Sequence, residues 1–155
     1  MGTEIERKFL LKNDSWRAGA VGTSYVQGYL SRDPSRTVRV RQAGAKAFLT
    51  IKGRPEGIAR AEFEYEIPTT DAAELFALCI SPLIEKTRYR IPFAGHWWEV
   101  DEFHGANAGL IIAEIELAAA DEAFEKPGWV GEDVSGDPRY ANSRLSECPY
   151  STWEK

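Results

Sequence analysis

Charged side chains recur in pairs along this chain, and the members of each pair stand two residues apart and carry the same sign. The acidic pairs are Glu4/Glu6, Glu62/Glu64, Glu99/Asp101 and Glu114/Glu116, and the basic pairs are Arg39/Arg41 and Lys86/Arg88. Two-residue spacing along a β-strand puts both side chains on one face, roughly 6.6–6.8 Å apart, so each pair can converge on one ion or one phosphate chain. Clustered carboxylates favour hard divalent cations such as Mg²⁺ or Mn²⁺, whereas Arg and Lys favour phosphate oxygens. Together the pairs predict a site for a polyphosphate that carries a divalent metal ion.

Each pair taken alone is also typical of an ordinary amphipathic strand, with one face on the core and the other in water. The full set of pairs weakens this interpretation. A face that is merely solvated accepts Ser, Thr, Asn and Gln freely, yet paired acids recur on four strands and paired bases on two more. We therefore expect the charged faces to serve a common site.

The elements that must position these residues are mainly β-strands. Alternation of polar and apolar residues predicts eight strands, at residues 3–11, 24–31, 36–43, 46–53, 58–67, 84–92, 96–104 and 109–118. A run of cap-type residues followed by helix formers predicts a helix that starts near Thr70. Short helical stretches are expected near residues 13–18, 119–125 and 138–147. The sequence contains no repeat or linker, so we expect a single domain over residues 1–155.

Eight strands can close into a barrel whose interior has room for side chains or one small ligand. Closure would turn the charged faces inward and leave the apolar faces to pack outward against the helices. Charges buried in a dry interior are costly, so the lumen must be wet, internally paired or completed by a ligand. The expected fold class is therefore mainly β (α+β), a closed eight-stranded barrel with a charged lumen and a few flanking helices.

Composition narrows the function classes. The chain has 155 residues, with 19 Lys and Arg against 24 Asp and Glu, and its formal net charge is −5. This balance argues against the broad basic surface that nonspecific nucleic-acid binding requires. The acidic start of the chain lacks the pattern of a signal peptide, and Cys79 and Cys148 fit neither a disulfide framework nor a zinc cluster. We expect a cytoplasmic protein with no nucleic-acid and no membrane partner.

The motif Glu4-Ile5-Glu6-Arg7-Lys8 resembles the ExExK signature of the CYTH superfamily, the triphosphate tunnel metalloenzymes. The resemblance covers nearly the whole chain. It continues through Gln27-Gly28-Tyr29-Leu30, Val38-Arg39-Val40-Arg41, Thr50-Ile51-Lys52, Glu62-Phe63-Glu64, Glu85-Lys86-Thr87-Arg88-Tyr89, Glu99-Val100-Asp101, Glu114-Ile115-Glu116, Gly131-Glu132-Asp133-Val134 and Arg139-Tyr140-Ala141-Asn142. ExExK alone is a weak signal in a charged protein, but the ordered set at strand spacing is specific.

The resemblance implies an eight-stranded antiparallel tunnel that holds a triphosphate and a divalent metal ion. It implies these metal ligands: Glu4, Glu6, Glu114 and Glu116, with Asp101 assisting and with Glu62 and Glu64 at a second ion. It implies these phosphate ligands: Arg39, Arg41, Lys52, Lys86 and Arg88, with Lys8 near the reacting end. Lys8 and Tyr29 resemble a proposed base dyad. Nearby cations would lower the pKa of Lys8 and of Tyr29, which predicts an alkaline pH optimum.

The activity implied by the resemblance is metal-dependent hydrolysis of inorganic tripolyphosphate to pyrophosphate and phosphate, with Mg²⁺ or Mn²⁺ as cofactor and a small-molecule triphosphate as partner. The superfamily also includes class IV adenylate cyclases and thiamine, nucleoside and RNA 5′-triphosphatases, and a metal-dependent polyphosphate-binding barrel without turnover is the non-enzymatic alternative. The sequence leaves open whether the chain is a monomer or a homodimer, and whether the segment around Tyr140 and Asn142 closes one mouth of the tunnel.

Overall fold

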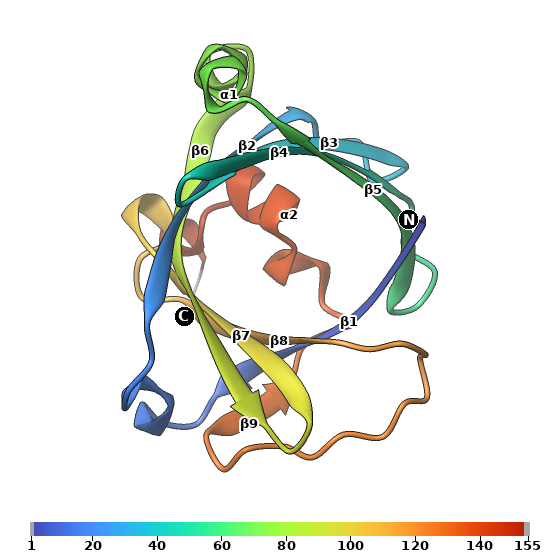
Figure 1. Ribbon diagram of the computed structural model, residues 1–155, viewed down its shortest axis with the longest axis vertical. Helices are drawn as coiled ribbons and strands as arrows, with labels where there is room; N and C mark the ends of the chain where they lie inside the picture. The colour runs from blue at the N-terminus through green and yellow to red at the C-terminus, as the bar shows by residue number, and fades with distance from the viewer. Residues whose placement is uncertain (1, 154–155) are drawn as a thin grey trace.

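A computed structural model gives the structure of residues 2–153, which form a closed antiparallel β-barrel (Figure 1). Its strands are β1 (Gly2–Leu11), β2 (Gly22–Ser31), β3 (Arg36–Ala43), β4 (Lys46–Gly53), β5 (Ala59–Ile67), β6 (Ile80–Phe93), β7 (His96–Phe103) and β8 (Ile111–Glu116). Around the barrel they run β5-β4-β3-β2-β6-β7-β8-β1, and β1 pairs back onto β5 to close it. The expected eight-stranded barrel is confirmed.

The strand bounds follow the alternation closely in the hairpins and less closely beside irregular segments. The predicted strands 36–43 and 46–53 have the observed bounds of β3 and β4. The turn between β6 and β7 has Ala94 and Gly95 at positive φ, 50° and 83°, as a two-residue hairpin loop requires. β6 begins at Ile80, four residues before the predicted start at 84, because its first residue pairs with Tyr29 of β2.

The structure corrects the sequence prediction between residues 117 and 133. No helix forms over 119–125; the Glu122 carboxylate accepts a hydrogen bond from the backbone N–H of Ala118, and Phe124 packs on Phe9 and Trp98. A ninth strand, β9 (Val130–Asp133), pairs with the end of β1 and was not predicted. Four residues with two consecutive acids are too short to display an alternating pattern.

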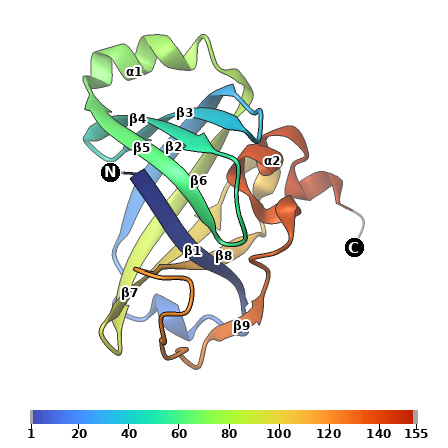
Figure 2. The same cartoon turned by 90° about the vertical axis from the view of Figure 1, so that its right-hand side faces the viewer.

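Two α-helices accompany the barrel. α1 (Thr69–Phe76) packs against the outside of β3 and β4 and confirms the helix predicted near Thr70. α2 (Asn142–Glu147) lies across the far opening in Figure 1 and at one end of the barrel in Figure 2. The single-turn 3₁₀ helices cover Ser15–Arg17, Gly105–Asn107, Pro138–Tyr140 and Tyr150–Thr152. The short helical stretches expected near 13–18 and 138–147 are therefore confirmed.

The apolar core lies outside the barrel wall and at one of its ends. One cluster gathers Phe9, Trp16, Trp98, Val100, Ala113, Ile115, Leu117, Trp129 and Val130. A second gathers Ile84, Phe103, Leu110, Ile112, Val134, Tyr140 and Leu145 of α2, and a small third one joins Val40 and Ala47 to Ala72 of α1. The polar residues between these positions along the strands are thereby directed into the barrel. None of the helices within residues 2–153 is long and apolar enough to cross a membrane.

Candidate functional site

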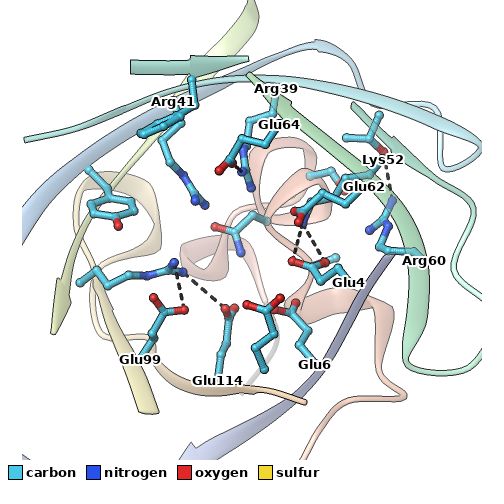
Figure 3. A pocket seen from close by; sticks show the side chains of 18 of the residues that line it. Glu4, Glu6, Arg39, Arg41, Lys52, Arg60, Glu62, Glu64, Glu99 and Glu114 are labelled. Atoms are coloured by element: carbon cyan, nitrogen blue, oxygen red, sulfur yellow. Dashed lines mark hydrogen bonds and ion pairs between the residues drawn. The ribbon is translucent and has the colours of Figure 1, made fainter. Parts of the chain in front are cut away.

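The barrel encloses a cavity of about 310 Å³ that is lined mostly by charged side chains (Figure 3). Its lining residues include Glu4, Glu6, Lys8, Tyr25, Tyr29, Thr37, Arg39, Arg41, Phe48, Lys52, Arg60, Glu62, Glu64, Lys86, Arg88, Glu99, Glu114, Glu116, Ala141, Asn142 and Ser143. The structure thus brings together every side chain predicted for the site except that of Asp101. The cavity is open to solvent, which meets the requirement that so much charge stay hydrated, paired or bound to a ligand.

Two bases of β3 face three acids of β1, β7 and β8 across the cavity. In Figure 3 Arg39 and Arg41 point inward from β3, and Glu6, Glu99 and Glu114 point toward them from the opposite wall. The two arginines share a face because they stand two residues apart on one strand. A ligand that bridges the walls must therefore offer negative charge to one side and positive charge to the other.

The acidic wall brings like charges together across neighbouring strands. Glu6 of β1 lies directly opposite Glu116 of β8, and Glu99 of β7 lies directly opposite Glu114 of β8. Burial, together with the charges of Glu114 and Glu4, raises the pKa of Glu6 to about 8. Burial and the charge of Glu4 also raise the pKa of Glu116. The protein's own cations therefore leave part of this wall uncompensated.

Two lysines form ion pairs with several of the acidic side chains. Lys52 Nζ lies 3.0 Å from Glu4 Oε1 and 3.5 Å from Glu62 Oε2. Although burial opposes it, Lys52 lowers the pKa of Glu4. Lys8 Nζ lies 3.6 Å from Glu114 Oε2 and 3.9 Å from Glu6 Oε1, and it donates to the backbone oxygen of Tyr140 at 3.3 Å.

The pKa of Lys8 is raised, whereas the sequence prediction was a lowered value. Burial would lower the pKa of Lys8, but the carboxylates of Glu114, Glu6 and Glu4 outweigh it. The expectation counted a bound metal ion among the cations around Lys8. The charges that the chain itself places around this ammonium group are mainly anionic.

Asp101 lies beneath the cavity floor, where it contacts two basic side chains. The residue has no exposed surface, and its two carboxylate oxygens accept hydrogen bonds from Lys86 Nζ at 2.7 Å and from Arg88 Nε and Nη2 at 2.7 and 2.8 Å. Although burial opposes it, Arg88 and Lys86 hold the pKa of Asp101 far below its usual range. Both of its oxygens are thus engaged with basic groups in this structure.

The basic wall combines restrained guanidinium groups with unsatisfied donors. Arg39 Nη2 contacts Thr50 Oγ1 at 3.2 Å and Glu64 Oε2 at 3.4 Å, while its Nε is buried without a hydrogen-bond partner. Burial, together with Arg39 and Arg88, lowers the pKa of Arg41 to about 10. Burial beside Arg88 and Arg41 also lowers the pKa of Lys86 to about 7, although Asp101 opposes this. An anion in the cavity would raise the pKa of Arg41 and of Lys86 again, and its oxygens would accept hydrogen bonds from donors such as Arg39 Nε.

The C-terminal segment lines one end of the cavity. The sequence left open whether this segment closes one mouth of the tunnel. Ala141, Asn142 and Ser143 line it, and α2 lies across this end of the barrel. A second cavity of about 310 Å³ shares Glu4, Glu6 and Lys8 with the first and extends beside the same segment. The segment therefore covers this end without sealing it completely.

Several lining residues were not predicted as part of the site. Arg60 and Tyr25 are in phase with predicted residues on their own strands, so the same alternation could have found them, whereas Glu99 was named in an acidic pair and given no individual role. Asn142 offers no such signal, because it reaches the site from a helix far along the chain. The lack of a side chain at Gly28 allows Leu83 and Cys79 to pack closely against β2, because a Cβ there would lie 2.6 Å from Leu83 Cδ2 and 2.9 Å from Cys79 Sγ.

The carboxylates have the chemistry that a divalent cation requires. Oxygen ligands suit Mg²⁺ and Mn²⁺, and the repulsion along the acidic wall is what a bound cation would relieve. Within residues 2–153, no three His, Cys, Asp or Glu side chains already form a ligand set for a metal ion. Lys8 and Lys52 instead contact several of these carboxylates. The donor set fits a metal ion in type, and ion binding would require these side chains to rearrange.

Comparisons with known proteins agree with this geometry. The family model of the CYTH domain matches residues 2–143. The chain is 49% identical over 156 residues to an inorganic triphosphatase of Acetivibrio thermocellus, with 100% of both chains covered. It is 37% identical over 150 residues to an inorganic triphosphatase of Nitrosomonas europaea, with 93% of this chain and 97% of that protein covered. A crystal structure of an inorganic triphosphatase superposes with a TM-score of 0.64 at 35% identity, over 92% of this chain and 96% of the other.

Proposed function

The chain belongs to the CYTH domain family, and from this premise we propose that it is a divalent-metal-dependent inorganic triphosphatase that cleaves tripolyphosphate to pyrophosphate and phosphate. Membership of this family implies that the protein binds a divalent metal ion, and the carboxylate oxygens of the acidic wall favour Mg²⁺ or Mn²⁺. The observation that carries the proposal is the pair of facing walls, one basic and one acidic, inside a single cavity.

The basic residues bind and align the substrate. Arg39, Arg41, Lys52, Lys86 and Arg88 all line the cavity, so a chain of three phosphates can contact several of them at once. Phosphoryl transfer asks a protein mainly to position the reactants and to neutralise charge on oxygen, and this basic row does both. Lys8, between the acidic wall and the C-terminal segment, would hold the terminal phosphate.

The acidic residues hold the metal ion. We assign this role to Glu4, Glu6, Glu114 and Glu116, and we place Glu62 and Glu64 near a second ion. A divalent ion supplies positive charge that stabilises the phosphate oxygens during hydrolysis. We assign Asp101 a different role from the one expected, because its oxygens already accept three hydrogen bonds from Lys86 and Arg88. It positions these two cations for the substrate.

Hydrolysis needs a water molecule, which attacks the terminal phosphorus while the bond to the bridging oxygen breaks and pyrophosphate leaves. Lys8 and Tyr29 both line the cavity, and we propose that Tyr29, as its phenolate, accepts the proton from the water. Lys8 keeps its phosphate-binding role beside Glu6 and Glu114. No protein nucleophile is required by this scheme.

The experiment that tests the proposal is a phosphate-release and product assay. It compares tripolyphosphate, ATP, thiamine triphosphate and pyrophosphate, each with Mg²⁺, with Mn²⁺ and with EDTA. Metal-dependent release of one phosphate from tripolyphosphate, with pyrophosphate as the other product, is the expected result. Binding of tripolyphosphate without turnover would replace the enzyme with a binding barrel, and cyclic AMP formed from ATP would replace it with a cyclase.

A further inference from the structure

A short relay of amide groups joins two of the phosphate-binding cations to the C-terminal segment. Arg41 Nε donates to Gln27 Oε1 at 2.9 Å, and Gln27 Nε2 donates to Asn142 Oδ1 at 3.0 Å. Lys86 Nζ donates to the same Asn142 oxygen at 2.9 Å. Gln27 is completely buried, so the relay connects β2, β3, β6 and α2 through an interior side chain.

Arg41 fixes the direction of the hydrogen bonds in the relay. A guanidinium group can only donate, so the Gln27 oxygen must face Arg41. The amide nitrogen of Gln27 is thereby turned toward the Asn142 oxygen. With two donors on that oxygen, the Asn142 amide is held in one orientation.

This orientation leaves the amide nitrogen of Asn142 free to donate. Among the contacts of residues 2–153, no protein acceptor meets Asn142 Nδ2, and this atom is not among the buried polar atoms that lack a partner. Asn142 lines the cavity beside Lys86 and Arg88. This N–H group is therefore available to an acceptor in the cavity.

We infer that Asn142 is a substrate-binding residue whose amide N–H donates to a phosphate oxygen, and that Gln27 is a positioning residue that orients it. The inference rests on the proposed function, since it takes the occupant of the cavity to be a polyphosphate. A hydrogen bond from a neutral donor to a charged oxygen is stronger than one between neutral groups. The C-terminal segment is then part of the binding site and more than a cover over it.

Asn142→Asp tests the role of the amide nitrogen. The substituted side chain keeps an oxygen for Gln27 and Lys86, but it replaces the N–H donor with a negatively charged oxygen. Asn13→Asp is the matched control, because Asn13 is exposed and its Oδ1 also accepts two hydrogen bonds, both from Ser15. The readouts are the dissociation constant of tripolyphosphate, measured by calorimetry in EDTA, and KM and kcat with Mg²⁺.

Asn142→Asp should weaken tripolyphosphate binding and raise KM by about tenfold or more, and Asn142→Ala should do so by about three- to tenfold. Asn13→Asp should leave both within about twofold of the wild-type values. Wild-type binding and KM in Asn142→Asp would overturn the inference. Wild-type protein that binds tripolyphosphate without cleaving it would overturn the proposed function alone, whereas wild-type protein that neither binds nor cleaves it would overturn both.

A double-mutant cycle tests Gln27. Gln27→Met removes the hydrogen bonds of this side chain with Arg41, Asn142 and the Tyr29 hydroxyl at similar volume. In that background Asn142→Ala should weaken tripolyphosphate binding less than it does in the wild-type protein. If Gln27→Met fails to fold, Gln27→Glu keeps the acceptor for Arg41 and removes the N–H donor to Asn142 and to the Tyr29 hydroxyl, and the readout stays the dissociation constant of tripolyphosphate. If the role of Gln27 were purely structural, its substitution would lower the melting temperature, and the effects of the Gln27 and Asn142 substitutions on affinity would be additive. Additive effects would overturn the positioning role.

Discussion

Glu6 of β1 and Glu116 of β8 lie directly opposite each other in the antiparallel register, with both side chains in the cavity. Like charges in this position destabilise a sheet. The apolar clusters outside the barrel hold the two strands together despite this repulsion. A cation bound beside this pair would relieve the repulsion, which leads to the predictions that follow.

The first prediction concerns the stability of the metal-free protein. The pKa of Glu6 is raised from its ordinary value of 4.5 to about 8, so the folded state favours the protonated carboxyl group. Its contribution to stability is present in full below pH 4.5 and is lost as the pH rises through about 8. In EDTA, the melting temperature should fall over this interval, and it should fall less in Glu6→Gln. Parallel pH curves for the two proteins would contradict the assignment.

The second prediction concerns the metal ligands. Glu116→Gln should reduce metal-dependent phosphate release by about a hundredfold or more, because it removes a charged ligand without changing the volume of the side chain. The metal-free variant should be at least as stable as the wild-type protein, since a repulsive pair is removed. Glu125→Gln on an exposed loop is the control. Wild-type turnover in Glu116→Gln at every Mg²⁺ concentration would remove Glu116 from the metal site.

The third prediction separates Asp101 from the metal ligands. Asp101→Asn leaves Lys86 and Arg88 buried without their carboxylate, so the free energy of unfolding should fall by about 3–5 kcal/mol. The neighbouring Glu102 forms an exposed ion pair with Arg17, and Glu102→Gln should cost less than about 1 kcal/mol. Urea unfolding of both variants is the measurement. If Asp101→Asn has unchanged stability and needs a higher Mg²⁺ concentration for activity, Asp101 is a metal ligand after all.

The fourth prediction concerns proton transfer. Tyr29→Phe should lower kcat for tripolyphosphate by about a hundredfold and change KM little, because the hydroxyl group acts on the water and not on substrate binding. Tyr65→Phe on the exposed outer face of β5 should have no effect on either constant. A change confined to KM would make Tyr29 a binding residue.

The barrel and most of its lining could be predicted because strand alternation ties each charged residue to a face. Glu4, Arg39 and Glu114 all follow from a period of two, and outward packing of residues such as Val40 and Ile115 fixes which face is inside. The same rule extends to Arg60, which differs from the predicted residues Glu62 and Glu64 only in its position along the strand.

The remaining features depend on tertiary contacts that no local pattern encodes. Asp101 has the same phase as the lining residues, yet two basic neighbours cover it. Asn142 enters the site because Leu145 of α2 packs into the apolar cluster at the end of the barrel. The raised pKa of Lys8 likewise depends on Glu114, which lies opposite it on another strand.

The central claim is that the two walls of the cavity hold one metal-bearing triphosphate between them. Anomalous diffraction from a crystal grown with Mn²⁺ and tripolyphosphate tests it most directly. We predict a manganese peak beside Glu4, Glu6, Glu114 and Glu116, with phosphate density running along Arg39, Arg41 and Arg88. Manganese and phosphates bound only on the outer surface of the barrel, with the cavity containing water alone, would contradict the account.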